Sequence, residues 1–556
     1  MSALRQGPRA LERWVLARSP LGLVLAVLML GATLAPSLLV RTWVFQGVLS
    51  GVGLAVGYGV GVALTAAGRW LLGRVGWDPP VLGARPRWVL VAVLVVVAAL
   101  DVARAAGEHR WTWDRLGYSP TLTATAYVGA IGLALLTLLV LLVLAWLVRL
   151  LQRRVASVGA RWLPAWVAGG LALVVVLWAL LASANTWVLE RSLDGMNTAF
   201  AAEDLEVRAS TPGPAPDALR SGTPDSLVTW PEIGHEGRRF LTAGPTAEEI
   251  RELAPAGGPA VREPVRVYVG RAAADDVAGR VRLALAEMDR LGAFDRRAVL
   301  VVVPTGTGWV NEQIVAPPEW LLGGDVATVA VQYSHLPSPM AYLGEHEGAG
   351  ETGRQLIAGV QARIAQRPAT DRPALLVAGE SLGSHGGSEA FTDLDDLVAG
   401  TRASLWIGPP EFMHLRREAE RVRQPGSPQI APVVGEGRDV VFANRRTDLD
   451  GTRPRSVFLQ QADDPIVWWD VPTLWDRPDW LEERRDPAIN PAISWRPSAT
   501  FFNLTIDMAV ANDFDEDHGH LYGTQPLAAW AAMLHPRGWD TARVEELRVR
   551  LAVLGR

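Results

Sequence analysis

The chain has 556 residues, which exceeds one ordinary domain, so we expect two or three folded units. Hydrophobic residues make up 49% of it, a high share for a soluble protein, and the formal net charge of −5 argues against a nucleic-acid role. There is no cysteine, which excludes disulfides, thiol catalysis and thiolate metal sites.

The first third of the chain contains five apolar runs that predict transmembrane helices. The first is long enough to cross about 30 Å of hydrocarbon and too long for a cleaved signal peptide. The five runs are Leu21–Val40, Val44–Ala67, Trp88–Ala103, Ala124–Val148 and Trp166–Val188. We therefore expect a transmembrane helical domain over residues 1–190, held in the lipid bilayer of the plasma membrane as a multi-pass protein.

The positions of the arginines predict the orientation of these helices. Arginines gather before the first run, between the second and third, and between the fourth and fifth. By the positive-inside rule, the N-terminus is cytoplasmic, and five crossings place everything after about Glu190 outside the cell. Trp88–Ala103 is the shortest run. If it did not cross the membrane, everything after about Glu190 would lie on the cytoplasmic side instead.

Residues 191–260 are rich in Pro, Gly, Ser and charged residues, with Thr211–Pro216 the clearest non-helical stretch, and they predict a partly ordered linker. From about residue 261 to 556, short apolar strands alternate with helices such as Asp275–Leu291 and His346–Gln366. This alternation predicts an α/β domain with a mainly parallel sheet. The expected strands are Val265–Val269, Ala298–Val303, Ala327–Tyr333, Ala374–Ala378, Ser404–Ile407 and Val457–Gln460.

One of these strands leads directly into Gly379-Glu380-Ser381-Leu382-Gly383, a G-x-S-x-G pattern. In a nucleophile elbow the serine occupies a tight turn between a strand and a helix, and the glycines allow the close approach of neighbouring backbone. A Gly/Ser turn without function is the alternative. The strand before it and the small residues after it favour Ser381 as a nucleophile.

A serine nucleophile needs a base, an acid that orients the base, and amide donors for the oxyanion. Asp463 and Asp464 follow the strand Val457–Gln460, and His518 and His520 lie further along the chain. The backbone amides of Thr305, Gly306 and Leu382 are the candidate oxyanion donors. Each feature has another explanation: the acids could form a turn before Pro465, and the histidines, with acidic residues nearby, could bind a metal.

The chain at this point resembles the actinobacterial membrane-anchored α/β-hydrolases, in which a multi-helix membrane domain precedes a hydrolase domain. The matching motifs are PTGTGWV (Pro304–Val310), GGD (Gly323–Asp325), QYSHLPS (Gln332–Ser338), GESLGS (Gly379–Ser384), LWIGPP (Leu405–Pro410), DPIVWW (Asp464–Trp469), PDWL (Pro478–Leu481) and HGHLYG (His518–Gly523).

The resemblance implies an α/β-hydrolase fold for residues 261–556, with a cap at about residues 409–455 and no metal or other cofactor. The family acid begins the D-P-I-V-W-W motif, which implies Asp464 as the acid and Asp463 as a bystander. The histidine motif resembles G-H-G-H-x-Y, with Asp517 in place of the first glycine. The intact Gly-His step favours His520 as the base, with His518 as its rival, and Asp517 is expected to hold His518 charged or to pull it aside.

Tryptophans gather after the acid, and Trp309, Trp468 and Trp469 are candidates for substrate contact. A site at the outer leaflet favours a lipid or lipid-like ester, cleaved through an acyl-enzyme on Ser381. An acyltransferase that acts on envelope lipids or glycans would use the same residues. A membrane-tethered scaffold with a hydrolase-like fold is the non-enzymatic alternative.

Overall fold

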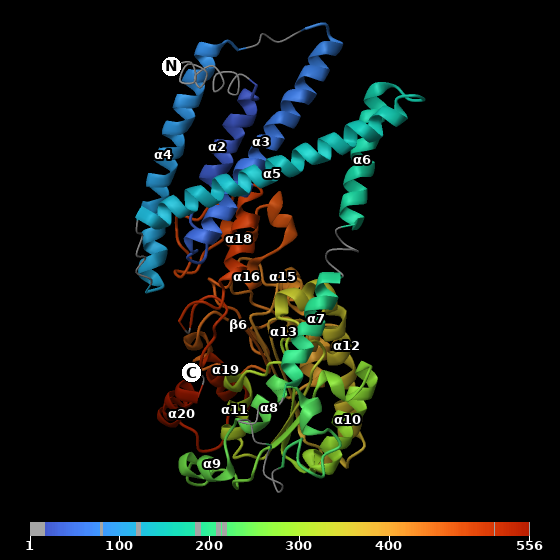
Figure 1. The fold of residues 1–556 in the computed structure, drawn as a ribbon. Helices are drawn as coiled ribbons and strands as arrows, with labels where there is room; N and C mark the ends of the chain where they lie inside the picture. The colour runs from blue at the N-terminus through green and yellow to red at the C-terminus, as the bar shows by residue number, and fades with distance from the viewer. Residues whose placement is uncertain are drawn as a thin grey trace. The chain divides into compact units, whose positions relative to one another are not determined.

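The computed structural model describes residues 17–77, 82–117, 124–183, 191–206, 213, 219–515 and 517–554. The chain folds as two compact units, coloured by residue number in Figure 1. The first unit comprises Met1–Ser183 together with Trp469–Glu482 and Asp486–Asp513. The second comprises Ala184–Trp468, Glu483–Arg485 and Phe514–Arg556.

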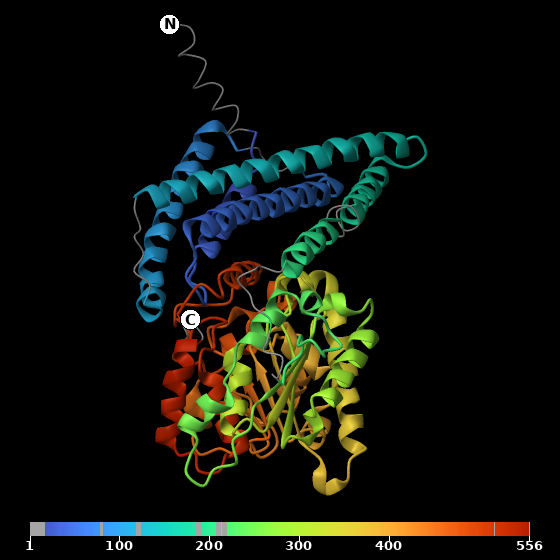
Figure 2. The same cartoon turned by 60° about the horizontal axis from the view of Figure 1, so that its bottom comes forward.

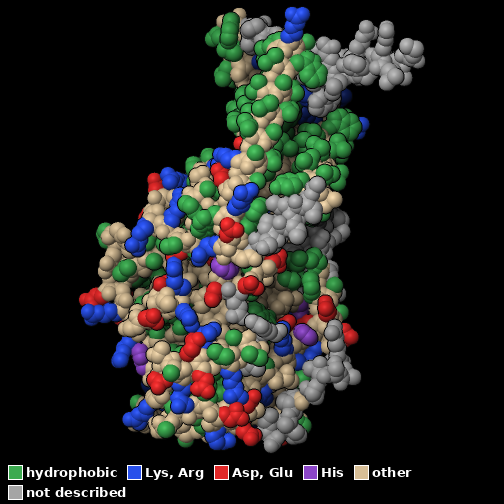
Figure 3. Space-filling view, turned by 90° about the vertical axis from the view of Figure 1, so that its left-hand side faces the viewer, with side chains coloured by type: hydrophobic (Ala, Val, Ile, Leu, Met, Phe, Trp, Pro, Cys, Tyr) green, Lys and Arg blue, Asp and Glu red, His purple; other side chains and the backbone are tan. Residues whose placement is uncertain are grey.

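The N-terminal part of the first unit consists of apolar helices. They are α2 (Pro20–Thr33), α3 (Trp43–Arg74), α4 (Ala84–Arg115), α5 (Ala124–Gly159) and α6 (Ala165–Ser183). Three of them are long and apolar enough to cross a membrane, over Trp43–Arg74, Ala84–Arg115 and Thr125–Gly159. Hydrophobic side chains crowd the surface of this unit in Figure 3, and the exposed ones on α5 include Leu136, Leu139 and Val143. Such a surface is typical of helices in lipid.

One of the five predicted runs gives a shorter helix than expected. Helix α2 ends at Thr33, and Pro36 lies shortly beyond it, where a proline cannot donate the backbone hydrogen bond that a helix needs. Helix α6 extends to Ser183, and residues 184–188 of the fifth run lie outside the described residues. The side of the membrane on which each end lies stays a prediction.

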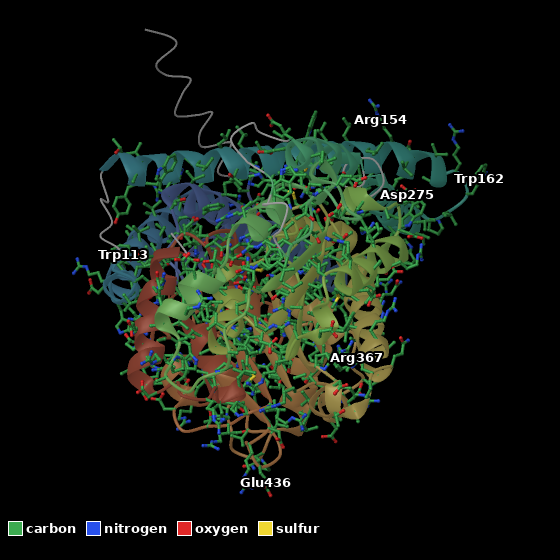
Figure 4. The ribbon with its side chains drawn as sticks, turned by 90° about the horizontal axis from the view of Figure 1, so that it is seen from below. Trp113, Arg154, Trp162, Asp275, Arg367 and Glu436 are labelled. Carbon is green, nitrogen blue, oxygen red and sulfur yellow. The ribbon has the colours of Figure 1, made fainter. Side chains whose placement is uncertain are left out.

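The third run gives a longer helix than expected. Helix α4 continues past Asp101 to Arg115, and the Arg104 side chain lies 3.9 Å from the Asp101 carboxylate and 3.8 Å from that of Glu108. Charges spaced three and four residues apart share one helix face, so the charged residues extend the helix instead of ending it. Arg154 of α5 and Trp162, in the turn before α6, project from the outside of the α5–α6 hairpin (Figure 4).

The rest of the first unit is formed by residues that lie, in the sequence, between the predicted acid Asp464 and the predicted base His520. We call Trp469–Glu482 and Asp486–Asp513 the excursion. It contains η8 (Val471–Leu474), α17 (Asp479–Glu482) and α18 (Ala499–Ala509), and α18 packs against α2 and α3. The sequence predicts these residues as part of the catalytic domain, whereas in the structure they fold with the apolar helices.

A buried ion pair joins the excursion to the loop after α2. Nε of Arg41 lies 3.0 Å from Oδ1 of Asp507, and both side chains are almost fully buried. The backbone amide of Leu38 also donates to Asp507, at 3.0 Å. Elsewhere, the amide of Asn490 donates to the Thr112 hydroxyl at 2.9 Å. Because buried polar groups must find partners, these bonds tie the excursion to the helices around it.

The second unit is built on a sheet of seven strands that all pair in parallel. In chain order they are β1 (Val265–Val269), β2 (Ala298–Val303), β3 (Val326–Val331), β4 (Ala374–Glu380), β5 (Ala403–Ile407), β6 (Val440–Ala443) and β7 (Ser456–Leu459). Their order across the sheet is β1-β3-β2-β4-β5-β7-β6. The strands are apolar on both faces and almost entirely buried, as parallel strands between two helix layers must be.

Helices cover both faces of this sheet (Figure 2). One group includes α10 (Val277–Arg290), α12 (Ser338–Ala365) and α13 (Leu382–Ser388), and the other includes α11 (Glu312–Leu321), α19 (Gln525–Leu534) and α20 (Thr541–Leu554). The other α-helices described in this unit are α7 (Arg191–Leu205), α8 (His235–Thr242), α9 (Ala247–Leu253), α14 (Leu394–Gly400), α15 (His414–Val422) and α16 (Pro465–Trp468). The predicted α/β fold with a parallel sheet is confirmed.

Two details of the second unit differ from expectation. Strand β6 lies within the predicted cap and pairs with β7, so this insertion completes the sheet at one edge. The predicted linker contains α7, α8 and α9, while Thr211–Pro216, apart from Gly213, lies outside the described residues.

Candidate active site

Ser381 lies between the end of β4 and the start of α13, with a backbone φ of 55° and ψ of −124°. Few non-glycine residues adopt this region, and it is typical of a serine in a nucleophile elbow. Two backbone hydrogen bonds hold the turn: the Ser381 amide donates to Ile407 at 2.8 Å, and the Ser384 amide donates to Ser381 at 2.9 Å. The surrounding sheet therefore maintains a strained conformation at this serine.

The glycines of the G-x-S-x-G pattern are required by close backbone contacts. A Cβ atom at Gly379 would overlap the carbonyl of Gly383, and one at Gly383 would overlap the carbonyl of Val303. Helix α13 therefore starts against the ends of β4 and β2, an approach that only glycine permits.

Asp464 and His520 form a buried pair in the same unit. Nδ1 of His520 lies 2.7 Å from Oδ2 of Asp464, and the Tyr522 hydroxyl donates to the same oxygen at 2.8 Å. The backbone amide of Ile466 donates to the other carboxylate oxygen at 2.9 Å. Because Asp464 accepts bonds on both oxygens, its carboxylate is fixed toward the imidazole.

The environment of His520 favours its charged form. Burial by itself lowers the pKa of His520, but the charge and hydrogen bond of Asp464, with a contribution from Glu380, raise that pKa above its ordinary value. Its Nε2 atom is buried and has no hydrogen-bond partner among the described residues. With Nδ1 directed at Asp464, Nε2 is the nitrogen that remains to accept a proton.

Ser381 and His520 both lie against the end of β5. The Ser381 amide donates to Ile407, the last residue of that strand. The next residue is Gly408, with a φ of 51°, and a Cβ atom there would overlap the imidazole of His520. Among the described residues the Ser381 hydroxyl forms no hydrogen bond with either candidate histidine, so the structure pairs each histidine with a carboxylate and neither with the serine.

The rival residues form a second pair of the same kind. Nδ1 of His518 lies 2.9 Å from Oδ2 of Asp463. Asp517, expected to act on His518, instead accepts a bond from the amide of Gln525 at 2.8 Å. Its φ of 72° explains why the motif has glycine at this position, because few other residues tolerate a left-handed backbone and aspartate is among those that do.

The three candidate oxyanion amides differ in their availability. The amide of Thr305 donates to the carbonyl of Trp309 at 3.1 Å, within the turn after β2. The amide of Gly306 donates to the Ser338 hydroxyl at 3.2 Å. The amide of Leu382 opens α13 and has no partner among the described residues. Leu382 is therefore the best placed donor, and Gly306 could act only after release from Ser338.

The candidate tryptophans have different surroundings. Trp468 is 2% exposed, its indole N–H donates to Ala462 at 3.0 Å, and the Arg416 guanidinium lies over its ring. Trp468 therefore supports the loop that carries Asp464. Trp309 is half-buried in the turn after β2. Trp469 belongs to the excursion, where its indole N–H donates to Thr505 at 2.8 Å.

Sequence reasoning did not single out Glu380, Asn311, Gly408 or Tyr522. Glu380 is the variable residue of the G-x-S-x-G pattern, and the amide of Asn311 lies 3.2 Å from its carboxylate. Tyr522 is part of the histidine motif, so a systematic search of the motif residues would have included it. In the described part of the chain, no three His, Asp or Glu side chains come together in a way that could hold a metal ion.

Two family comparisons agree with this geometry. The alpha/beta-hydrolase family matches residues 265–547, and the N-terminal region of an alpha/beta-hydrolase family matches residues 34–245. No curated protein and no solved structure matches the chain significantly. The matched ranges cover both the apolar helices and the sheet with the elbow, and the chain belongs to the alpha/beta-hydrolase family.

Proposed function

We propose that the protein is a membrane-anchored serine hydrolase that cleaves a lipid or lipid-like ester through an acyl-enzyme on Ser381. The observation that carries the proposal is the buried His520–Asp464 pair, which faces the same strand end as the strained Ser381. A buried histidine with one nitrogen fixed by a carboxylate and the other unpaired is suited to accept the proton of a serine.

In the first step, Oγ of Ser381 forms a bond to the ester carbonyl carbon while Nε2 of His520 takes the serine proton. Asp464 accepts the hydrogen bond of Nδ1, which fixes the required tautomer and stabilises the imidazolium. The Leu382 amide stabilises the charge on the carbonyl oxygen. The tetrahedral intermediate then expels the alcohol, which takes the proton from His520, and an acyl-serine remains.

In the second step, water attacks the acyl carbon and His520 takes a proton from that water. Ser381 then leaves as the alcohol with the proton returned by His520, which releases a carboxylic acid. An acyltransferase would differ only in that an alcohol replaces the water. Both reactions use the same residues, so the products decide between them.

An apolar ester is the substrate class that suits the rest of the chain. Among the described residues, three helices are long and apolar enough to cross a membrane, and such helices would hold the hydrolase unit near a lipid surface. The half-buried Trp309 lies in the turn that carries the candidate oxyanion amide of Gly306. An aromatic side chain there would offer apolar contact to the acyl group.

The test is ester hydrolysis by the full chain in detergent micelles, with p-nitrophenyl esters of short and long acyl chains. We expect turnover that is lost in Ser381→Ala and kept in Ser388→Ala, a matched control whose hydroxyl only donates to the backbone of His385 in the same helix. Adding a long-chain alcohol separates the outcomes, because an acyltransferase would form a new ester. No turnover by the wild type would favour the scaffold, and equal turnover by wild type and Ser381→Ala would show that Ser381 is not the nucleophile.

A further inference from the structure

Glu380 is a buried carboxyl group directly beside the nucleophile, and the mechanism above does not use it. It is the last residue of β4 and 7% exposed. Its hydrogen-bond partner among the described residues is the neutral amide of Asn311, at 3.2 and 3.3 Å from the two carboxylate oxygens. No Arg forms an ion pair with Glu380 in the described part of the chain, in contrast to the buried Glu319, which pairs with Arg266.

A buried carboxylate without a cationic partner is unfavourable, so its presence needs an explanation. Glu380 pairs with Ile407 in the sheet, and the next residue, Gly408, lies against the imidazole of His520 and the carboxylate of Asp464. His520 and Asp464 are therefore the charged groups near Glu380 among the described residues. The pKa of Glu380 lies above its ordinary value, because burial raises it and the charge of Asp464 adds to this rise, while the charge of His520 and the bond from Asn311 offset only part of it. In the described part of the chain, the cation near Glu380 is therefore the imidazolium of His520, which exists only when that histidine holds a proton.

The interaction is reciprocal, since the charge of Glu380 also favours the protonated form of His520. Asp464 is the other carboxylate that faces this imidazole, and it is fixed by Tyr522 and the backbone. Asn311 is held in turn, because its side-chain oxygen accepts from the amide of Gln313 at the start of α11. Its amide group is thereby directed at Glu380.

We propose that Glu380 is a positioning residue. Its carboxylate, together with that of Asp464, stabilises the positively charged imidazolium that forms when His520 takes the proton of Ser381. This inference rests on the proposed serine hydrolase function. Two carboxylates thus act on one imidazole: Asp464 through a direct hydrogen bond and Glu380 through its charge across a buried site, where charges interact more strongly than in water. The hydrogen bond from Asn311 favours the ionised form of Glu380 and fixes the orientation of its carboxylate.

The test is the rate of inactivation by a fluorophosphonate at a series of pH values, measured on the full chain in detergent. The reaction needs neutral His520, so the rate rises with pH through the pKa of that histidine. Glu380→Gln removes the charge and should lower the midpoint of this rise by about half to one pH unit. It should also reduce the rate at high pH about tenfold, because the imidazolium that forms in the reaction is less stabilised.

Two further variants separate charge from structure. Glu380→Asp keeps the charge and should return the midpoint toward that of the wild type. Asn311→Ala should shift the midpoint in the same direction as Glu380→Gln but by less, because the carboxylate loses only its hydrogen-bond donor. The unfolding temperature of Glu380→Gln should equal or exceed that of wild type, since a neutral amide is less costly to bury than an unpaired carboxylate.

A Glu380→Gln chain with the wild-type midpoint and rate would overturn the inference. A fall in its unfolding temperature with an unchanged midpoint would also overturn it and mark Glu380 as purely structural. A wild-type chain that reacts at no pH would overturn both the inference and the proposed function. If the wild type reacts and Glu380→Gln reacts with the same midpoint and rate, the inference about Glu380 is overturned and the proposed function is not.

Discussion

Nδ1 of His520 lies 2.7 Å from the carboxylate of Asp464, and Nδ1 of His518, two residues earlier, lies 2.9 Å from the carboxylate of the adjacent Asp463. The two pairs share their chemistry and differ in burial. The side chain of His520 is 7% exposed and that of His518 is 21% exposed. Only the Asp464 carboxylate also accepts a bond from Tyr522. The deeper and more tightly held pair is the one we assign to catalysis.

This assignment predicts unequal effects of the two histidines. His520→Ala should reduce kcat/KM for an ester about a thousandfold or more, because the serine loses its base. His518→Ala, the matched control, should retain activity within about tenfold. Kinetics on the two purified variants decide between them, and a greater loss in His518→Ala would make Asp463 and His518 the working pair.

Gly408 provides a test that leaves every polar group of the site in place. A methyl group at Gly408→Ala would overlap the imidazole of His520, so we expect the ring to move and ester turnover to fall at least tenfold. Gly426→Ala is the matched control, since Gly426 has a similarly positive φ, of 87°, with open space around it. Equal turnover by the two variants would show that the position of His520 does not matter.

The raised pKa of His520 predicts opposite effects of pH on activity and stability. Activity requires the neutral imidazole, so it should rise with pH through a value above the ordinary 6.5. Because the pKa is higher in the folded than in the unfolded chain, protonated His520 stabilises the fold fully below about 6.5. That contribution is lost as the pH rises through the folded pKa.

The measurement is a pair of pH series, one of ester turnover and one of unfolding temperature, on wild type and His520→Gln. The unfolding temperature of His520→Gln should lack the pH-dependent change that the titration of His520 causes in the wild type. A wild-type activity midpoint below 6.5 would contradict the raised pKa.

The buried Arg41–Asp507 pair predicts that the excursion depends on the apolar helices of the first unit for its fold. Asp507→Ala leaves the guanidinium buried without its partner, which typically costs about 3–5 kcal/mol. We expect faster proteolysis within residues 486–513 and a lower unfolding temperature. Glu545→Ala, which removes a solvent-exposed ion pair with Arg548, is the control and should change neither. Unchanged proteolysis of Asp507→Ala would show that the ion pair does not secure the excursion.

The parallel sheet and the elbow could be predicted because both depend on local patterns. Apolar runs such as Ala298–Val303 are typical of buried parallel strands, and the glycines around Ser381 reflect contacts within a single turn. Strand β6 was missed because four apolar residues within a polar insertion carry little periodic signal. Helix α4 is longer than the predicted run Trp88–Ala103 because that run follows apolar residues alone, whereas the spacing of Asp101, Arg104 and Glu108 allows the helix to continue.

The site was harder to predict, since its residues meet only through the fold. Two adjacent acids and two neighbouring histidines offer several pairings, and only the structure shows that each histidine takes its own acid. The bonds of Thr305 and Gly306 to Trp309 and Ser338 depend on how one loop turns, which composition does not reveal. The burial of Glu380 likewise cannot be predicted from the sequence.

The most direct test of the account is to treat the full chain in membranes with a fluorophosphonate and to locate the adduct by peptide mass spectrometry. We predict one phosphonylated peptide, modified at Ser381, which disappears in Ser381→Ala and forms far more slowly in His520→Ala. A wild-type chain that takes up no probe, or one modified at another residue while Ser381 stays free, would contradict the central claim.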